Sequence, residues 1–170
     1  MDFKKLYKKK SPRDLILYSV ILAVGIFADQ LTKLLAVKYL MHVHSVPIWK
    51  DVLHLTYVEN RGAAFGMLAG APWVFNTISI ITVIIILGYL YLGHAENRLY
   101  AVSLSMIASG GIGNLIDRLS LGYVVDFIDF TLIDFAVFNG ADSFVCVGAG
   151  LLVLALILDI ARESRGGAKK

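Results

Sequence analysis

The chain has 170 residues, of which 58% are hydrophobic and only 17% charged, and its mean hydropathy is +0.72. This composition excludes an ordinary soluble globular domain and is typical of a protein that crosses a bilayer several times. The net charge of +3 does not indicate a nucleic-acid partner, because the basic residues gather in the two terminal tails and no nucleic-acid-binding motif accompanies them.

Hydrophobic runs predict a polytopic α-helical membrane protein with four transmembrane helices in one membrane-embedded domain over residues 1–170. The second run is the longest, since no charged residue occurs from 62 to 95. About 20 apolar residues at 1.5 Å per residue cross a hydrocarbon layer of about 30 Å. The predicted spans are approximately 15–38, 71–93, 98–118 and 140–161.

The first span follows a basic tail and could be mistaken for a removable signal peptide. No small-x-small cleavage site follows it, because Ile26 would hold the −3 position before Ala28, and the apolar pattern resumes beyond Asp29. We therefore expect this span to be retained. Most Lys and Arg residues lie in the N-terminal tail, the 93–98 turn and the C-terminal tail, so the positive-inside rule predicts that both termini are cytoplasmic.

The segments 41–70 and 119–139 are then extracytoplasmic, and they do not read as plain linkers. DVLHLTYVEN (51–60) alternates apolar and polar residues, and YVVDFIDFTLIDF (123–135) is rich in β-branched and aromatic residues. These patterns predict a small β-sheet on the outer face of the membrane. Trp49 and Trp73 are expected to anchor at the interface.

Polar residues of the predicted spans converge at one level of the bilayer. Counted from the inner end of the first span, Asp29 lies about 21 Å along the helix. The other members of this outer level are Lys33, Asn114, Asp117, Arg118, Asn139 and Asp142, and Asp126 precedes the last span. Ionisable groups at such depth are costly and usually functional.

Each of these residues also has a purely structural interpretation. Asp29 and Lys33 stand at i and i+4 and could simply pair on one helix face, buttressing a site. Asp117 and Arg118 could form a clamp that ends the third span, or could contact a substrate.

The same holds for the residues of the last turn before the fourth span. Asn139 could be the N-cap of the last helix with Asp142 at N3, where the unsatisfied N–H groups favour a carboxylate. Asp126 could be one of several solvated loop acids, together with Asp129 and Asp134.

Several catalytic arrangements lack their residues here, and no metal site or cofactor is expected. There is no H-E-x-x-H metalloprotease motif, and GGIGNLID places Asn114 where an intramembrane G-x-G-D motif has Asp. His42 and His44 could share one face of a strand, but two ligands without a third are weak evidence for zinc. The single cysteine, Cys146, has apolar neighbours and is expected to pack inertly.

Two carboxylates, Asp126 and Asp142, remain the best chemical pair. If they share a site, repulsion and desolvation would leave the pair with one proton near neutral pH. The ionised member could then take a proton from an attacking water while the protonated member donates to the scissile carbonyl oxygen. The sequence does not assign base and acid, because such a pair titrates as a unit.

Five motifs in order carry a resemblance to a known family. They are DQLTK (29–33), NRGAAFG (60–66), GGIGNLIDR (110–118), VVDFID (124–129) and FNGADS (138–143). Together with the four spans they closely resemble the lipoprotein signal peptidases, or signal peptidase II, of bacteria. The resemblance implies an aspartic endopeptidase of the cytoplasmic (inner) membrane. This enzyme would remove the signal peptide of prolipoproteins on the amino side of a diacylglyceryl-modified cysteine.

The resemblance also implies the roles of individual residues. The VVDF and N-x-A-D aspartates, Asp126 and Asp142, correspond to the catalytic pair. Residues expected to line or support the site are Asp29, Lys33, Asn60, Gly110, Asn114, Arg118, Asn139 and Ala141. The family fold is a four-helix bundle with an extracytoplasmic sheet cradle and an accessory helix, and binding of the cyclic peptide antibiotic globomycin is expected.

One residue departs from the family pattern, and two other function classes stay open. Gly140 stands where the family usually has an apolar side chain, and we expect Gly140→Val to keep activity. An ion-coupled carrier would use Asp29, Lys33, Asp117 and Arg118 as a relay across the membrane. A structural or assembly subunit would explain the hydrophobicity but not the converging carboxylates.

Overall fold

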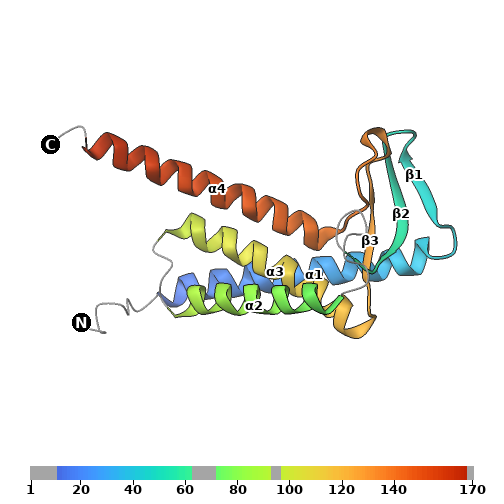
Figure 1. The fold of residues 1–170 in the computed structure, drawn as a ribbon, viewed down its shortest axis with the longest axis horizontal. Coiled ribbons are helices and arrows are strands. Elements are labelled where there is room, and N and C mark those ends of the chain that lie inside the picture. The colour runs from blue at the N-terminus through green and yellow to red at the C-terminus, as the bar shows by residue number, and fades with distance from the viewer. Residues whose placement is uncertain (1–10, 63–71, 93–96, 168–170) are drawn as a thin grey trace.

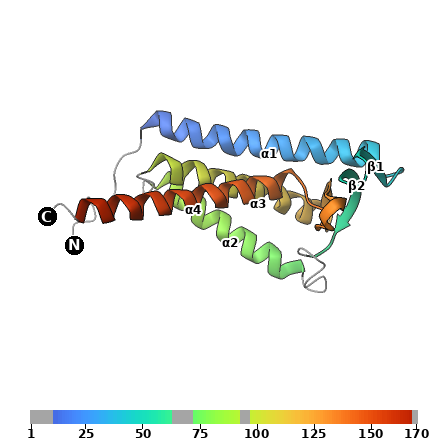
Figure 2. The same ribbon diagram turned by 90° about the horizontal axis from the view of Figure 1, so that it is seen from above.

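A computed structural model describes residues 11–62, 72–92 and 97–167 of the chain. Four helices lie along its long axis, and a small sheet stands across one end of them (Figures 1 and 2). The helices are α1 (Pro12–Leu40), α2 (Pro72–Tyr91), α3 (Arg98–Ser120) and α4 (Gly140–Gly167). α1 begins and α4 ends at the end of the bundle far from the sheet (Figure 1).

The helices confirm a polytopic helical membrane protein, and their apolar residues explain it. Within the described residues, α1, α3 and α4 are long and apolar enough to cross a membrane, and α2 contributes a shorter apolar stretch, Asn76–Tyr91. Many large apolar side chains point outward, among them Phe27 (68% exposed) and Ile84 (64% exposed). Such exposure is compatible with lipid as the surrounding solvent and would be unfavourable in water.

α1 and α3 begin at side-chain caps that their sequences supply. Ser11 accepts a hydrogen bond from the backbone N–H of Arg13, and Pro12 occupies the first turn of α1. Asn97 caps α3 in the same way through the N–H of Leu99. Inside the bundle, α1, α2 and α3 pack through one cluster of buried residues: Tyr18, Leu22, Ile86, Leu90, Ala101 and Ala108.

The predicted outer sheet is present and has three antiparallel strands in the order β1 (Ser45–Trp49), β2 (Leu53–Asn60) and β3 (Val124–Asp129). In its register Leu55 faces Ile128 and Val58 faces Asp126, with an irregularity between these two pairs. The pattern at 123–135 extends beyond the strand that forms, because β3 ends at Asp129 and Thr131–Ile133 makes one turn of 3-10 helix. β1 contains Pro47, which an edge strand tolerates.

A second cluster of buried residues fixes the sheet to the bundle. Ala36 and Leu40 at the end of α1 pack against Val125 and Phe127 of β3. Val125 and Phe127 therefore face α1, and Asp126 between them points to the other side of the strand, where Asn139 at the start of α4 lies. The strand that carries Asp126 is thus held directly at the end of α1.

Two expectations for the segments 41–70 and 119–139 are not met within the described residues. His44 has a positive φ of 63° and precedes β1, so His42 and His44 do not share a strand face. Residues 63–66 of the NRGAAFG motif lie outside the described part of the chain. The described outer residues hold three strands and the 3-10 turn, and the expected accessory helix is not among them.

Candidate active site

Asp126 is buried, with 1% of its surface exposed, although it belongs to β3, an edge strand of the sheet. It is therefore not a solvated loop acid. Its Oδ2 accepts a hydrogen bond from Asn60 Nδ2 at 2.8 Å, and its Oδ1 accepts one from Asn139 Nδ2 at 2.6 Å. Burial raises the pKa of Asp126 to about 6, the amides of Asn60 and Asn139 oppose the rise, and the charge of Asp142 adds to it. This carboxyl group can therefore hold a proton up to about pH 6.

Asp142 lies in the first turn of α4, and the cap interpretation of this turn is confirmed. The backbone N–H of Asp142 donates to Asn139 Oδ1 at 3.0 Å, and the N–H of Asn139 donates back to Asp142 Oδ2 at 3.2 Å. This reciprocal pattern is a capping box with Asn139 as N-cap. Asn114 Nδ2 binds the other oxygen, Oδ1, at 2.8 Å. Asp142 takes part in the cap of α4 and also belongs to the site, so the structural and the functional interpretation of this residue are compatible.

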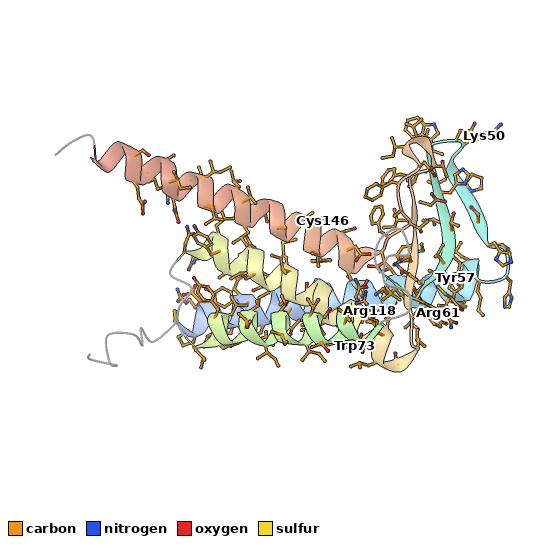
Figure 3. The ribbon with its side chains drawn as sticks, in the orientation of Figure 1. Lys50, Tyr57, Arg61, Trp73, Arg118 and Cys146 are labelled. Carbon is orange, nitrogen blue, oxygen red and sulfur yellow. The ribbon has the colours of Figure 1, made fainter. Side chains whose placement is uncertain are left out.

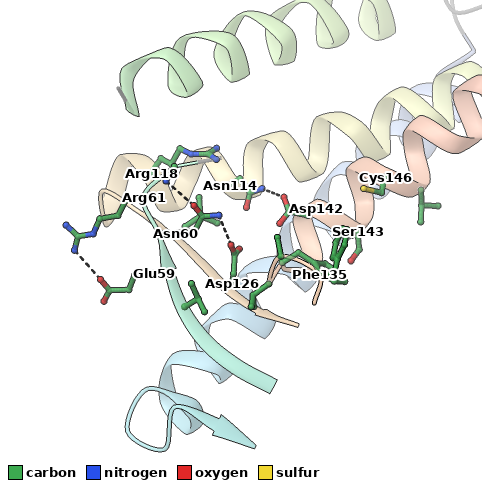
Figure 4. A pocket seen from close by; sticks show the side chains of 17 residues that line it. Glu59, Asn60, Arg61, Asn114, Arg118, Asp126, Phe135, Asp142, Ser143 and Cys146 are labelled. Atoms are coloured by element: carbon green, nitrogen blue, oxygen red, sulfur yellow. Dashed lines mark hydrogen bonds and ion pairs between the residues drawn. The ribbon is translucent and has the colours of Figure 1, made fainter. Parts of the chain in front are cut away.

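Two asparagines connect the carboxylates. Asn139 Nδ2 contacts Asp126 and also donates to Asn114 Oδ1 at 3.0 Å, while Asn114 Nδ2 holds Asp142. The side chains of Asp126, Asn139, Asn114 and Asp142 therefore form one continuous hydrogen-bonded chain. Figure 4 shows the labelled Asp126, Asn60, Asn114 and Asp142 around a common space, contributed by β2, β3, α3 and α4.

Behind this chain lies a buried ionic cluster. The predicted pair of Asp29 and Lys33 forms, with a distance of 2.9 Å between Lys33 Nζ and Asp29 Oδ2. Lys33 also pairs with Asp117 at 3.0 Å. Asp117 further accepts hydrogen bonds from Gln30 and from the backbone N–H of Val125.

Sequence reasoning missed Gln30 as a member of the site. Its Nε2 donates to Asp117 at 2.9 Å, to Asp29 at 3.2 Å and to the carbonyl of Gly113 at 3.2 Å. Gln30 stands three residues before Lys33, and residues i and i+3 share a helix face. This spacing was a signal that Gln30 lies on the side of α1 that faces the site.

Close helix packing brings the remaining predicted residues into place. A Cβ on Gly110 would overlap the carbonyl oxygen of Ala141, so α3 and α4 approach closely there. Ala141 is fully buried, and its N–H donates to Asp29 Oδ1 at 2.8 Å. A Cβ on Gly140 would meet its nearest atoms, on Asp29 and Thr32, at 3.5 Å, which is ordinary contact. The unusual glycine is therefore not required by close approach.

A cavity of about 880 Å³ opens over the two carboxylates. Asn60, Asn114 and Arg118 supply polar groups on its wall, and the charge of Arg118 lies within electrostatic range of Asp126 and Asp142. Residues 135–138 and Val147 supply apolar groups to the cavity. The cavity is therefore amphipathic.

Cys146 lines this cavity and is exposed, so the expectation that it packs among apolar neighbours is wrong. Figure 3 labels Cys146 on α4, Arg118 near the end of α3 and Arg61 beside the sheet. Within the described residues, no three His, Cys, Asp or Glu side chains lie together as metal ligands would. The buried charged side chains of the described helices are Asp29, Lys33 and Asp117, which form one cluster beside β3 and do not continue as a relay along the bundle.

Comparison with known proteins places this chain among proteins of similar sequence and shape. A family model described as signal peptidase (SPase) II matches residues 21–158. A lipoprotein signal peptidase from Caldanaerobacter subterraneus is 54% identical over 138 residues, which are 81% of this chain and 94% of the relative. The lipoprotein signal peptidase of Brevibacillus brevis is 46% identical over 143 residues, 84% of this chain and 95% of the relative.

A solved structure agrees with these sequence relatives. A bacterial membrane enzyme determined by the in meso method at 2.3 Å resolution superimposes with a TM-score of 0.75 and 32% identity. The match covers 86% of this chain and 90% of that chain. The helix bundle and the sheet are therefore a shared architecture.

Proposed function

Because the chain belongs to the signal peptidase II family, we propose that it removes signal peptides from prolipoproteins as an aspartic endopeptidase, with Asp126 and Asp142 as its catalytic pair. The observation that carries this proposal is the hydrogen-bonded chain that joins the two carboxylates through Asn139 and Asn114 at the floor of one cavity. Residues that only capped a helix or only faced solvent would not need this connection.

The pair would work with one shared proton. Burial raises the pKa of Asp126 to about 6, and Asp142 lies at the N-terminus of α4, where Asn114 Nδ2 and the backbone N–H of Asn139 donate to its two carboxylate oxygens. The ionised carboxylate takes a proton from water as the water oxygen bonds to the scissile carbonyl carbon. The protonated carboxyl group gives its proton to the carbonyl oxygen. The C–N bond then breaks, the proton taken from water passes to the leaving nitrogen, and one hydroxyl of the tetrahedral intermediate returns its proton to the carboxylate that had protonated the carbonyl oxygen.

The cavity fits the proposed substrate, a prolipoprotein whose cysteine carries diacylglycerol. A peptide near the scissile bond needs polar partners, which Asn60, Asn114 and Arg118 offer. The acyl chains and the signal segment need an apolar environment, which residues 135–138 and Val147 offer. We propose that the site lies at the level where the membrane holds this bond. A globomycin-type cyclic peptide would occupy the same cavity.

We further propose that the protein is a multi-pass protein of the bacterial cytoplasmic membrane with both termini inside. α1 begins and α4 ends at the same end of the bundle, and in sequence most Lys and Arg residues precede α1 or lie at the end of α4 and beyond it. The site then lies near the outer face, where prolipoproteins emerge.

Cleavage of a diacylglyceryl-modified prolipoprotein by the purified protein in lipid tests the proposal. Wild type should cut before the modified cysteine. Asp126→Asn and Asp142→Asn should each lose at least about a hundredfold in rate, the lower end for removing a positioned acid or base. Asp129→Asn, on the same strand but bonded to Thr56, is the matched control and should keep activity.

Two results would contradict this proposal. Near-wild-type rates in either Asn variant would make that aspartate a cap or structural acid. An inert wild type would overturn the substrate, and proton flux in vesicles would then test the carrier alternative.

A further inference from the structure

Lys33 uses its whole donor capacity inside the protein. Its side chain is only 4% exposed, and Nζ contacts Asp29 Oδ2 at 2.9 Å, Asp117 Oδ2 at 3.0 Å and Asn114 Oδ1 at 2.9 Å. An ammonium group has three N–H bonds, so each contact can be a hydrogen bond. A buried cation satisfied in this way holds its three partners in one arrangement, because losing any of them leaves charge unpaired.

Both carboxylates of this cluster reach onward to a backbone N–H group. Asp29 Oδ1 accepts from Ala141 at 2.8 Å, and Asp117 Oδ2 accepts from Val125 at 3.1 Å. Ala141 immediately precedes Asp142, and Val125 immediately precedes Asp126. One ammonium group therefore lies between two carboxylates, each of which holds the backbone beside one member of the proposed catalytic pair.

We infer that the cluster of Asp29, Lys33 and Asp117 sets the separation of Asp126 and Asp142, and that Gln30 and Asp117 are positioning residues of the reaction. This inference rests on the proposed function. Gln30 strengthens the cluster because its amide donates to both carboxylates, Asp29 and Asp117, and to the Gly113 carbonyl.

The separation of Asp126 and Asp142 has to be fixed by other residues. Asp126 belongs to a sheet strand and Asp142 to a helix, so no single element fixes the distance between them. Two carboxylates in one site also repel each other whenever both are ionised. Displacement of a catalytic group by about 1 Å can cost about a hundredfold in rate, so backbone anchors on both sides are valuable.

Two substitutions at Asp117 separate positioning from general ion pairing. Asp117→Asn keeps an oxygen that can accept from Val125, whereas Asp117→Leu keeps the same branched arrangement of heavy atoms, with larger methyl groups, but no acceptor. With the prolipoprotein substrate in lipid, we expect kcat to fall about tenfold or less for Asp117→Asn and about a hundredfold for Asp117→Leu, with KM within about twofold of wild type in both. A higher kcat for Asp117→Asn than for Asp117→Leu is the result expected if the hydrogen bond from the Val125 N–H to residue 117 positions Asp126.

Gln30→Met and Asp14→Asn complete the experiment. Gln30 is half-buried and its loss leaves the ion pairs intact, so Gln30→Met should fold and should lower kcat several-fold at unchanged KM. Asp14→Asn breaks the other ion pair between α1 and α3, Asp14 with Arg98 at 3.3 Å, and should keep the wild-type kcat. Thermal unfolding in lipid shows whether each variant is folded.

The outcomes are distinguishable. If Gln30→Met keeps the wild-type kcat, and Asp117→Asn and Asp117→Leu lose activity equally or not at all, the cluster does not position the pair. A loss of kcat in Asp14→Asn as large as that in Asp117→Leu would also overturn the inference. Any ion pair between α1 and α3 would then affect the rate, and the cluster would have no special role. An inert wild type would instead remove the proposed function, and with it the inference that depends on it.

Discussion

At the scale of single residues, Asn60 controls the protonation of Asp126. Burial raises the pKa of Asp126 to about 6, and the hydrogen bond from Asn60 opposes the rise because it favours the ionised form. If Asp126 supplies the proton, kcat/KM should be high below about pH 6 and fall as pH rises through that value. Asn60→Leu removes the hydrogen bond that opposes the rise in the pKa of Asp126. The fall in kcat/KM on the alkaline side of the pH profile, its alkaline limb, should therefore move to higher pH.

A pH profile of kcat/KM for both proteins checks this. Thr56→Val, on the same strand but bonded to Asp129, is the control and should leave the limb in place. An alkaline limb that stays fixed or moves to lower pH in Asn60→Leu would contradict the assignment.

Asn139 combines a structural role with a role in the site, and the two can be separated. As N-cap it accepts from the N–H of Asp142, while its Nδ2 donates to Asp126 and Asn114. Asn139→Ser keeps a cap oxygen and loses the amide donor, whereas Asn139→Ala loses both. We expect both variants to lose at least about tenfold in activity, since the positioned donor is gone. Only Asn139→Ala should also lose about 1 kcal/mol of cap stability.

Chemical denaturation in detergent together with cleavage rates measures both effects. If Asn139→Ser retained full activity, the cap oxygen alone would matter, and the amide bond to Asp126 would be dispensable.

Gly140 should tolerate a side chain. A Cβ would lie 3.5 Å from its nearest neighbours, Asp29 and Thr32, and this position opens α4 without a positive φ. Gly140→Val should therefore keep the rate within about threefold of wild type, as expected for a change without overlap. A large loss in the cleavage assay would show that the γ-methyl groups displace Asp29 from Ala141.

At the scale of elements, the contact of α3 with α4 at Gly110 decides where Asp142 lies. A Cβ there would overlap the carbonyl oxygen of Ala141, a backbone atom that cannot rotate away, and would press on Val145. Gly110→Ala should cost about 1–3 kcal/mol, the usual range for overpacking. It should also lower activity because Ala141 adjoins Asp142.

Gly150 on α4 is the matched control, because a Cβ there meets no atom within 4 Å. Gly150→Ala should be neutral or slightly stabilising, since alanine favours the helix by up to about 1 kcal/mol. Equal unfolding temperatures for the two variants in lipid would contradict the close-packing argument.

Local signals explain how much of this arrangement could be predicted. The helices follow from apolar runs, and the cap of α4 follows from Asn139 and Asp142 at their spacing, because both depend on neighbours in sequence. The hydrogen bond of Gln30 to Asp117 could not be predicted in the same way. It joins residues 87 positions apart and depends on how α1 and α3 rotate against each other.

The same limit applies to β1 and Cys146. Ser45–Trp49 is a short edge strand with a proline and all its residues exposed, so it lacks the alternation that predicts a strand. Cys146 has apolar neighbours in sequence, but the rotation of α4 turns it to the cavity instead of a packed core.

At the scale of the whole molecule, the outward apolar surface should behave as a lipid-facing surface. Ile84 lies within α2 and is 64% exposed, so in a soluble protein Ile84→Arg would be nearly neutral. In a bilayer an arginine near the middle of a helix costs about 2.5–3.5 kcal/mol for insertion. Ile84→Arg should therefore lower the amount of folded protein in membranes severalfold.

Ile16 provides the control because it is equally exposed, at 62%, but lies in the second turn of α1, near the bundle end remote from the sheet. An arginine there can extend its charged group to the interface, so Ile16→Arg should insert at close to the wild-type level. Membrane fractionation followed by thermal unfolding in lipid compares the two variants. Equal yields would mean that α2 does not face hydrocarbon at Ile84, and the lipid-facing surface would then have to be assigned to other faces of the bundle.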